Sequence, residues 1–313
     1  MKIVLAGATG QIGTMLRRAW ERERHDLVVL SRNSSSATGR VIPWDGRTVG
    51  PWADSLDGAD VVVNLAGRSV NCRYTPRNLA DMMSSRVDST RVIGEAIARA
   101  QRPPRVWLQM STATIYAHRF DASNDEATGL LGGAEPDVPR YWDRSIEIAR
   151  AWEQALDDAP TPGTRKVALR TAMVMSPDAS GVFDTFATLA KRGLGGPAGN
   201  GRQFVSWIHE HDFVAAIRFL LARDDLTGPV NLCAPSPLPN RDFQHHLRLA
   251  LGVRVGLPAP RFLLEAGAWF LRTDTELILK SRRVAPRRLL EAGFTFAFPA
   301  WPEAAADLAR RWR

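Results

Sequence analysis

The chain opens with Met1-Lys2-Ile3-Val4-Leu5-Ala6-Gly7-Ala8-Thr9-Gly10-Gln11-Ile12-Gly13. An apolar run that predicts a strand leads into three glycines, and apolar residues at helical spacing follow over positions 12–20. Gly7 allows a tight turn, Gly10 lets the main chain approach a pyrophosphate, and Gly13 lets the helix pack close to the strand. This pattern predicts dinucleotide binding at a helix N-terminus. The predicted contacts are Gly7, Thr9, Gly10, Gln11, Ile12 and Gly13.

A second predicted strand, residues 27–31, ends in Ser31 and Arg32, about 20 residues beyond the glycines. At this place an acid would bind the 2′-hydroxyl of NAD, whereas an arginine can hold the 2′-phosphate of NADP. Ser31 and Arg32 are therefore predicted cofactor contacts, and NADP is favoured over NAD. The alternative for Arg32 is a solvated strand-end arginine.

Strands predicted at residues 60–67, 106–110 and 167–175 alternate with helices predicted at 76–100 and 140–156. This order predicts an α/β fold with a doubly wound, Rossmann-type parallel sheet. The alternation stops after Ser176, and the remainder predicts a smaller, mainly helical C-terminal domain. We expect residues 1–175, with 204–233, to form the nucleotide-binding domain, and 176–203 with 234–313 to form the second domain.

Composition and charge exclude several classes of protein. The 313 residues are 45% hydrophobic and contain no run of about 18 uncharged apolar residues, so no membrane association is expected. Cys72 and Cys233 predict free thiols and a cytoplasmic location. The net charge of +8 is spread along the chain, which predicts no nucleic-acid partner. A basic surface and attraction of an anionic cofactor or substrate both remain open.

Further motifs point to a family. The glycine turn, residues 64–67, the strand ending in Ser111 and Thr112, and Leu169-Arg170-Thr171 resemble an extended short-chain dehydrogenase/reductase. Three later stretches are similar to its atypical "epimerase family protein" group. They are Gly199-Asn200-Gly201-Arg202-Gln203, Ser206-Trp207-Ile208-His209 and Ser281-Arg282-Arg283-Val284-Ala285-Pro286.

The resemblance implies an NAD(P)-binding Rossmann domain with a small C-terminal domain over the active-site cleft, and a homodimer is compatible with it. It implies further cofactor contacts at Leu65, Ala66, Gly67 and Ser111. Arg86 stands where related proteins usually carry an asparagine. Its guanidinium group could bind a cofactor phosphate or replace a missing lysine charge, and the alternative is a surface arginine.

Typical members of the superfamily use a tyrosine, a lysine four residues later and a Ser or Thr hydroxyl. Here Ser145 and Ala149 stand at the tyrosine and lysine positions, and residues 140–156 contain no lysine. Thr112 matches the catalytic Ser/Thr, or it caps its own turn. Tyr116 is the nearest phenol and could act as the acid, but a pKa near 10 suits neutral pH poorly, and packing is its alternative role.

The spacing of His209 and His211, with Asp212 beside them, is compatible with a metal site, but none is predicted here. The resemblance instead makes Asp212 a helix N-cap and His209 a hydrogen-bonding residue. Val205 occupies the place of an arginine that binds the diphosphate in sugar-nucleotide epimerases.

The predicted function is an NADP-binding oxidoreductase or epimerase-like enzyme acting on a small carbonyl or hydroxyl compound. The alternative is a non-catalytic NADP(H)-binding redox sensor or scaffold.

Overall fold

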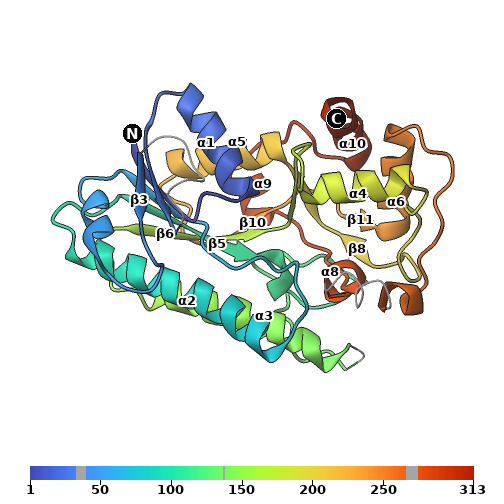
Figure 1. The fold of residues 1–313 in the computed structure, drawn as a ribbon, viewed down its shortest axis with the longest axis horizontal. Coiled ribbons are helices and arrows are strands. Elements are labelled where there is room, and N and C mark those ends of the chain that lie inside the picture. Colours follow the sequence, from blue (N-terminus) through green and yellow to red (C-terminus); the bar gives the residue numbers. More distant parts are fainter. Residues whose placement is uncertain (33–39, 137, 266–273) are drawn as a thin grey trace.

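A seven-stranded parallel sheet forms the centre of the molecule. The computed structural model describes residues 1–32, 40–136, 138–265 and 274–313. The strand order is β10-β6-β5-β4-β1-β2-β3, and every neighbouring pair is parallel (Figure 1). The strands are β1 (Lys2–Ala6), β2 (Asp26–Ser31), β3 (Arg40–Pro43), β4 (Val61–Asn64), β5 (Val106–Thr112), β6 (Arg165–Thr171) and β10 (Gly228–Leu232). The predicted doubly wound sheet is confirmed. A polar loop predicted at 33–38 lies outside the described residues.

Helices cover both faces of this sheet. α1 (Gln11–Arg22) and α5 (Glu210–Ala222) lie on one face, and α2 (Pro76–Arg99) and α3 (Asp143–Asp157) lie on the other (Figure 1). Successive side chains of a strand point to opposite faces, so Val61 and Val63 of β4 pack in the core under α1 and α5, whereas Val62 packs under α2. Burial on both faces explains why this strand reads as a continuous apolar run.

The strand order places a crevice beside the glycine turn. From β1 the chain winds outward through β2 to β3, and it then returns to β4 on the other side of β1. The carboxyl ends of β1 and β4 therefore diverge into helices on opposite faces. Open α/β sheets bind ligands at such a switch point.

The second part of the molecule is mainly helical and has its own aromatic core. In that core the rings of Phe243 and Trp301 stack with centroids 4.2 Å apart, and Trp207 lies 5.0 Å from Trp301. Further helices of the described residues include α4 (Val182–Lys191), α6 (Asn240–Ala250), α8 (Glu276–Leu279), α9 (Arg287–Glu291), α10 (Trp301–Arg311), and the short 3-10 helices η2 (Pro51–Ser55), η3 (Ala113–Ile115) and η4 (Arg140–Trp142). The helical C-terminal part agrees with the sequence prediction, and the exact domain boundaries stay a prediction.

Residues 204–209 form two strands with different partners instead of one continuous strand. β8 (Phe204–Val205) pairs antiparallel with β11 (Leu238–Pro239), and β9 (Trp207–His209) pairs parallel with β7 (Met173–Met175). Between them the Ser206 hydroxyl donates to the Arg282 carbonyl and accepts from the Val284 N–H. This change of partners depends on a distant segment, so local periodicity does not reveal it.

Candidate functional site

The glycine turn has the geometry that its sequence predicts. Gly7 adopts a φ of +72°, and a Cβ there would lie 2.7 Å from Cα of Ala66. A Cβ on Gly13 would lie 2.3 Å from Cα of Ala8, whereas a Cβ on Gly10 would meet nothing within 4 Å. The outer glycines therefore allow the backbone to pack, and the middle one borders open space. Gly10 is also the N-cap of α1 and offers no side chain to its free N–H groups.

A groove of about 1050 Å³ lies over this turn, at the switch point of the sheet. The predicted cofactor residues that line it are Gly7, Thr9, Gly10, Ser31, Arg32, Leu65, Ala66 and Gly67. The residues come from the ends of β1, β2 and β4, so separate segments meet as predicted. The volume, the glycine backbone and the helix N-terminus fit an elongated phosphate-containing ligand.

Arg32 is one of three arginines that line the groove. Arg47 and Arg68 also line it, and sequence reasoning missed both. Arg68 directly follows the predicted residues 65–67, and Arg47 lies just beyond β3, the edge strand of the sheet. The place of Arg68 next to predicted contacts is the signal that could have found it, whereas no predicted contact adjoins Arg47.

Two carboxylates that line the groove already have hydrogen-bond or ion-pair partners within the protein. Asp45 accepts the N–H groups of Arg47 and Thr48 and the hydroxyl of Thr48, and these bonds lower its pKa to about 2. Asp81 pairs with Arg68 at 2.5 Å. Three arginines against two carboxylates leave the lining of the groove with one net positive charge, which favours an anionic ligand.

Arg86 lies behind the groove wall instead of lining the groove. Its guanidinium group donates to the carbonyls of Met82 and Arg68 and lies 5.0 Å from the Trp152 ring. The guanidinium carbon would be 3.3 Å from a Cβ on Gly67. Burial lowers the pKa of Arg86 to about 10. Arg86 therefore supports the loop after β4 and places a charge beneath it, and the alternative of a free surface arginine is not what the structure shows.

Four other predicted cofactor residues do not line the groove: Gly13, which packs against Ala8, and three residues with larger side chains. The Gln11 side chain packs against Gly181, where its Nε2 atom would lie 2.7 Å from an added Cβ. Ile12 packs against the core under α1. The Ser111 hydroxyl donates to Oε1 of Glu153 at 2.6 Å. Their side chains support neighbouring segments instead of facing the groove.

The two predicted catalytic residues differ in their surroundings. Thr112 is partly exposed at the end of β5, and its Oγ1 accepts the N–H of Thr114 at 3.1 Å, so it caps η3. Tyr116 is buried; its hydroxyl donates to Asn231 at 2.9 Å and accepts from Arg170 at 3.0 Å. Burial raises the pKa of Tyr116, which does not favour the role of acid. Thr112 is the better placed of the two.

On α3, the positions of the usual tyrosine and lysine hold side chains with other partners. The Ser145 hydroxyl donates to Oε2 of Glu276 at 2.5 Å, and Ala149 is buried. Glu276 comes from α8, far along the chain. The C-terminal part thus reaches the region where the missing pair would lie.

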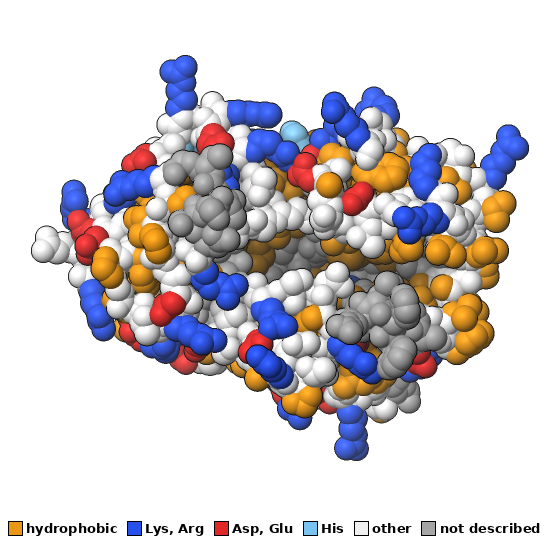
Figure 2. Space-filling model, viewed as in Figure 1, with side chains coloured by type: hydrophobic (Ala, Val, Ile, Leu, Met, Phe, Trp, Pro, Cys, Tyr) orange, Lys and Arg blue, Asp and Glu red, His pale blue; other side chains and the backbone are white. Residues whose placement is uncertain are grey.

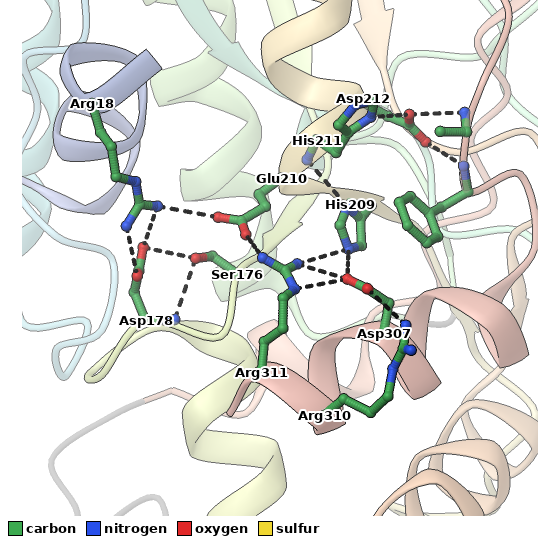
Figure 3. A network of polar contacts seen from close by, with 12 residues as sticks. Arg18, Ser176, Asp178, His209, Glu210, His211, Asp212, Asp307, Arg310 and Arg311 are labelled. Atoms are coloured by element: carbon green, nitrogen blue, oxygen red, sulfur yellow. Dashed lines mark hydrogen bonds and ion pairs between the residues drawn. The ribbon is translucent and has the colours of Figure 1, made fainter. Parts of the chain in front are cut away.

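A second hollow, of about 520 Å³, lies between α1, α5 and α10. Arg18 bridges Asp178 and Glu210, and Arg311 bridges Glu210 and Asp307 (Figure 3). Both arginines already have carboxylate partners, so the network joins α1, the loop after β7, α5 and α10 without leaving either arginine unpaired. Over the face shown in Figure 2, lysine and arginine side chains are spread over both rims of the central hollow.

His209 forms the hydrogen bonds that the resemblance implied, and it is also the N-cap of α5 in place of Asp212. Nδ1 of His209 accepts the N–H of His211 and caps α5, whereas Asp212 accepts the N–H groups of Ala297 and Phe298 (Figure 3). The Asp212 cap prediction is therefore wrong. Its carboxylate is used across the chain, because residues 297–298 fold back onto α5. Among the residues that the structure describes, no three His, Cys, Asp or Glu side chains are grouped to hold a metal ion.

This arrangement predicts a pH effect on stability. Nδ1 of His209 accepts a bond, so the neutral ring carries its proton on Nε2 and donates to Asp307 at 3.1 Å. Burial and the Arg311 charge lower the pKa of His209. Because the unfolded chain binds the proton first, the free energy of unfolding should fall as pH drops below about 6.5, by at most about 1.4 kcal/mol per unit from this group.

Urea titrations between pH 5 and pH 7.5 check this expectation. His209→Gln should reduce the slope of unfolding free energy against pH. His211→Gln is the control, because that side chain is largely exposed. An unchanged slope in His209→Gln would contradict the assignment.

Comparison with known proteins matches two segments of the chain. The sequence profile of the "NAD dependent epimerase/dehydratase family" matches residues 3–233. The chain belongs to this family. A "domain of unknown function" (DUF1731) matches residues 259–308. The epimerase family assignment agrees with the motifs of the glycine turn and of the C-terminal part.

Individual members of the epimerase family match along their whole length. The human "Epimerase family protein SDR39U1" is 30% identical over 302 residues, covering 96% of each chain. "Epimerase family protein YfhF" of Bacillus subtilis is 27% identical and covers 95% of this chain and 94% of its own. The crystal structure of human SDR39U1 (isoform 2) with NADPH superposes with a TM-score of 0.85 at 29% identity, covering 99% of both chains. The epimerase family group and the Rossmann-like fold inferred from the sequence are thereby confirmed.

Proposed function

We propose that this member of the epimerase family is an NADP-binding atypical short-chain dehydrogenase, an oxidoreductase or epimerase-like enzyme for a small carbonyl or hydroxyl compound. The observation that carries the proposal is the groove at the switch point, where a glycine turn and three arginines meet. The human relative was solved with NADPH, which supports the same cofactor here. The two free cysteines support a cytoplasmic location, and the family resemblance is compatible with a homodimer.

The residues of the groove fit the parts of the cofactor. The N–H groups at the start of α1 would hold the pyrophosphate, and Arg32 would hold the 2′-phosphate. Arg47 and Arg68 would add to the positive potential that holds these phosphates. When bound, the nicotinamide supplies a hydride donor or acceptor. Thr112 would hydrogen-bond the substrate oxygen, because its hydroxyl proton is not used by the turn that its oxygen caps.

Titration calorimetry with NADPH and NADH tests the cofactor assignment. NADPH should bind more tightly than NADH, because only NADPH has a phosphate for Arg32. Arg32→Ala should weaken NADPH by about tenfold to a hundredfold, the usual value of a hydrogen bond to a charged group. NADH affinity should not change.

Arg99→Ala is the matched control, since Arg99 is an exposed arginine at the end of α2. It should leave both affinities unchanged. Tighter binding of NADH than NADPH by the wild type would reject the NADP preference. No binding of either nucleotide would reject the proposed function.

The second candidate is a non-catalytic NADP(H)-binding sensor or scaffold. Two observations favour it: residues 140–156 have no lysine, and the phenol of Tyr116 is buried among hydrogen-bond partners. Turnover on a panel of carbonyl compounds that disappears in Thr112→Ala would favour the enzyme. Tight NADPH binding without hydride transfer, and a partner captured only with NADPH present, would favour the sensor.

A further inference from the structure

The C-terminal segment buries a cluster of charged side chains beside α3 and η3. Glu276 and Lys280 are 0% and 2% exposed. Arg282 is partly exposed, so the cluster lies directly beneath the surface. Charged side chains are rarely buried without partners, because removing a charge from water is costly.

The hydrogen bonds of the cluster are incomplete. Lys280 Nζ donates to the Thr114 carbonyl at 2.9 Å, and its Nζ lies 3.8 Å from Oε1 of Glu276. Arg282 donates through Nε to the Thr114 hydroxyl and through Nη1 to carbonyls of its own segment. Within the described part of the chain, Nη2 of Arg282 and Oε1 of Glu276 are buried without a hydrogen-bond partner.

The cations of the cluster have donors that its carboxylates do not use. Asp274 lies near Glu276, and Glu135 and Asp143 lie near Lys280, but the Glu135 carboxylate accepts the N–H groups of His118, Gly133 and Ala134. Burial lowers the pKa of Lys280 to about 8 and raises the pKa of Glu276. An anion would accept hydrogen bonds from the free donors of Lys280 and Arg282, and a hydroxyl or carbonyl oxygen next to it could accept another. Such a hydroxyl group could also donate to Oε1 of Glu276.

The position of the cluster connects it to the proposed chemistry. Ser145, which donates to Glu276, stands where related enzymes have their tyrosine, and Thr114 follows two residues after Thr112. We propose that Lys280 and Arg282 bind an oxyanion, a carboxylate or phosphate group, on the substrate of this protein. The inference rests on the proposed function and narrows its substrate to a small acid.

Calorimetry on the full-length protein, first titrated with NADPH, tests the site without any need for turnover. The probes are lactate, its neutral analogue lactamide, and inorganic phosphate. Lactate or phosphate should bind, and which of them binds more tightly identifies a carboxylate or a phosphate substrate. Lactamide should bind at least tenfold more weakly than lactate, because it has no charge for the two cations.

Variants separate a binding site from a structural ion cluster. Lys280→Met and Arg282→Gln should each weaken the anion by tenfold or more and leave NADPH affinity unchanged. Lys191→Met is the control, because Lys191 is an exposed lysine on α4 that donates to the Leu251 carbonyl. Glu276→Gln keeps the shape, removes the competing charge and should strengthen anion binding, a result that a structural role would not produce.

Two results would overturn the inference. One is a wild type that binds NADPH but neither lactate nor phosphate. The other is anion binding that persists unchanged in Lys280→Met and Arg282→Gln and is not strengthened in Glu276→Gln. A wild type that fails to bind NADPH would instead reject the proposed function, so the two failures are distinguishable.

Discussion

Gly13→Ala should lower the free energy of unfolding by about 3 kcal/mol, at the upper end of the cost of overpacking. The new methyl carbon would lie 2.3 Å from Cα of Ala8 and 2.5 Å from its carbonyl carbon and oxygen. These are backbone atoms, so no side-chain rotation can relieve the contact. Urea titration gives the stability, and calorimetry should show that NADPH binding is lost as the turn shifts.

Gly10→Ala is the matched control in the same turn. A Cβ there has open space within 4 Å, and the residue has an ordinary φ of −85°. Stability should change by no more than about 0.5 kcal/mol. NADPH affinity should fall by at least about tenfold, since the methyl group enters the space that the pyrophosphate needs. Equal stability of the two variants would contradict this account of the turn.

Arg170→Met should lower the free energy of unfolding by about 3–5 kcal/mol, the usual cost of leaving one member of a buried ion pair alone. Arg170 donates to both oxygens of Glu153, at 2.9 and 2.6 Å, and both side chains are nearly buried. It also donates to the Tyr116 hydroxyl. The substitution leaves the Glu153 charge with the Ser111 hydroxyl alone. Urea titration at pH 7.5 measures the loss.

The double variant Arg170→Met/Glu153→Met separates the stranded charge from lost packing. It should recover most of the loss, because no uncompensated charge stays buried. Tyr116→Phe should cost only about 1 kcal/mol, the net value of a hydrogen bond. A loss below about 1 kcal/mol in Arg170→Met would show that solvent reaches the pair and that the network is not buried in solution.

The groove could be predicted because its parts are local. Each strand end carries its own signal, and the parallel order of the strands brings Gly10, Arg32 and Gly67 to one edge of the sheet. Arg86 was singled out correctly as unusual, but its contact with the wall behind Gly67 depends on how α2 packs. Arg47 was missed because no local pattern tells which arginine of a loop turns toward a ligand.

The C-terminal charges could not be found in this way. Ser145 and Glu276 are 131 residues apart, and no sequence motif around either residue indicates that the two are in contact. The residues next to Tyr116 in the sequence do not predict that its hydroxyl group forms hydrogen bonds with Arg170 and Asn231. Hydrogen bonds of this kind depend on which segments the chain brings together.

The sequence by itself determined the parallel sheet, the glycine turn and the absence of the tyrosine and lysine on α3, because strand periodicity, glycine spacing and residue identity are properties of short segments. Only the tertiary structure decided which side chains stand in the place of that pair. Glu276, Lys280 and Arg282 reach it because the C-terminal part packs against α3 and η3. Burial there changes the pKa of Glu276 and Lys280, and burial depends on the contacts of the whole chain.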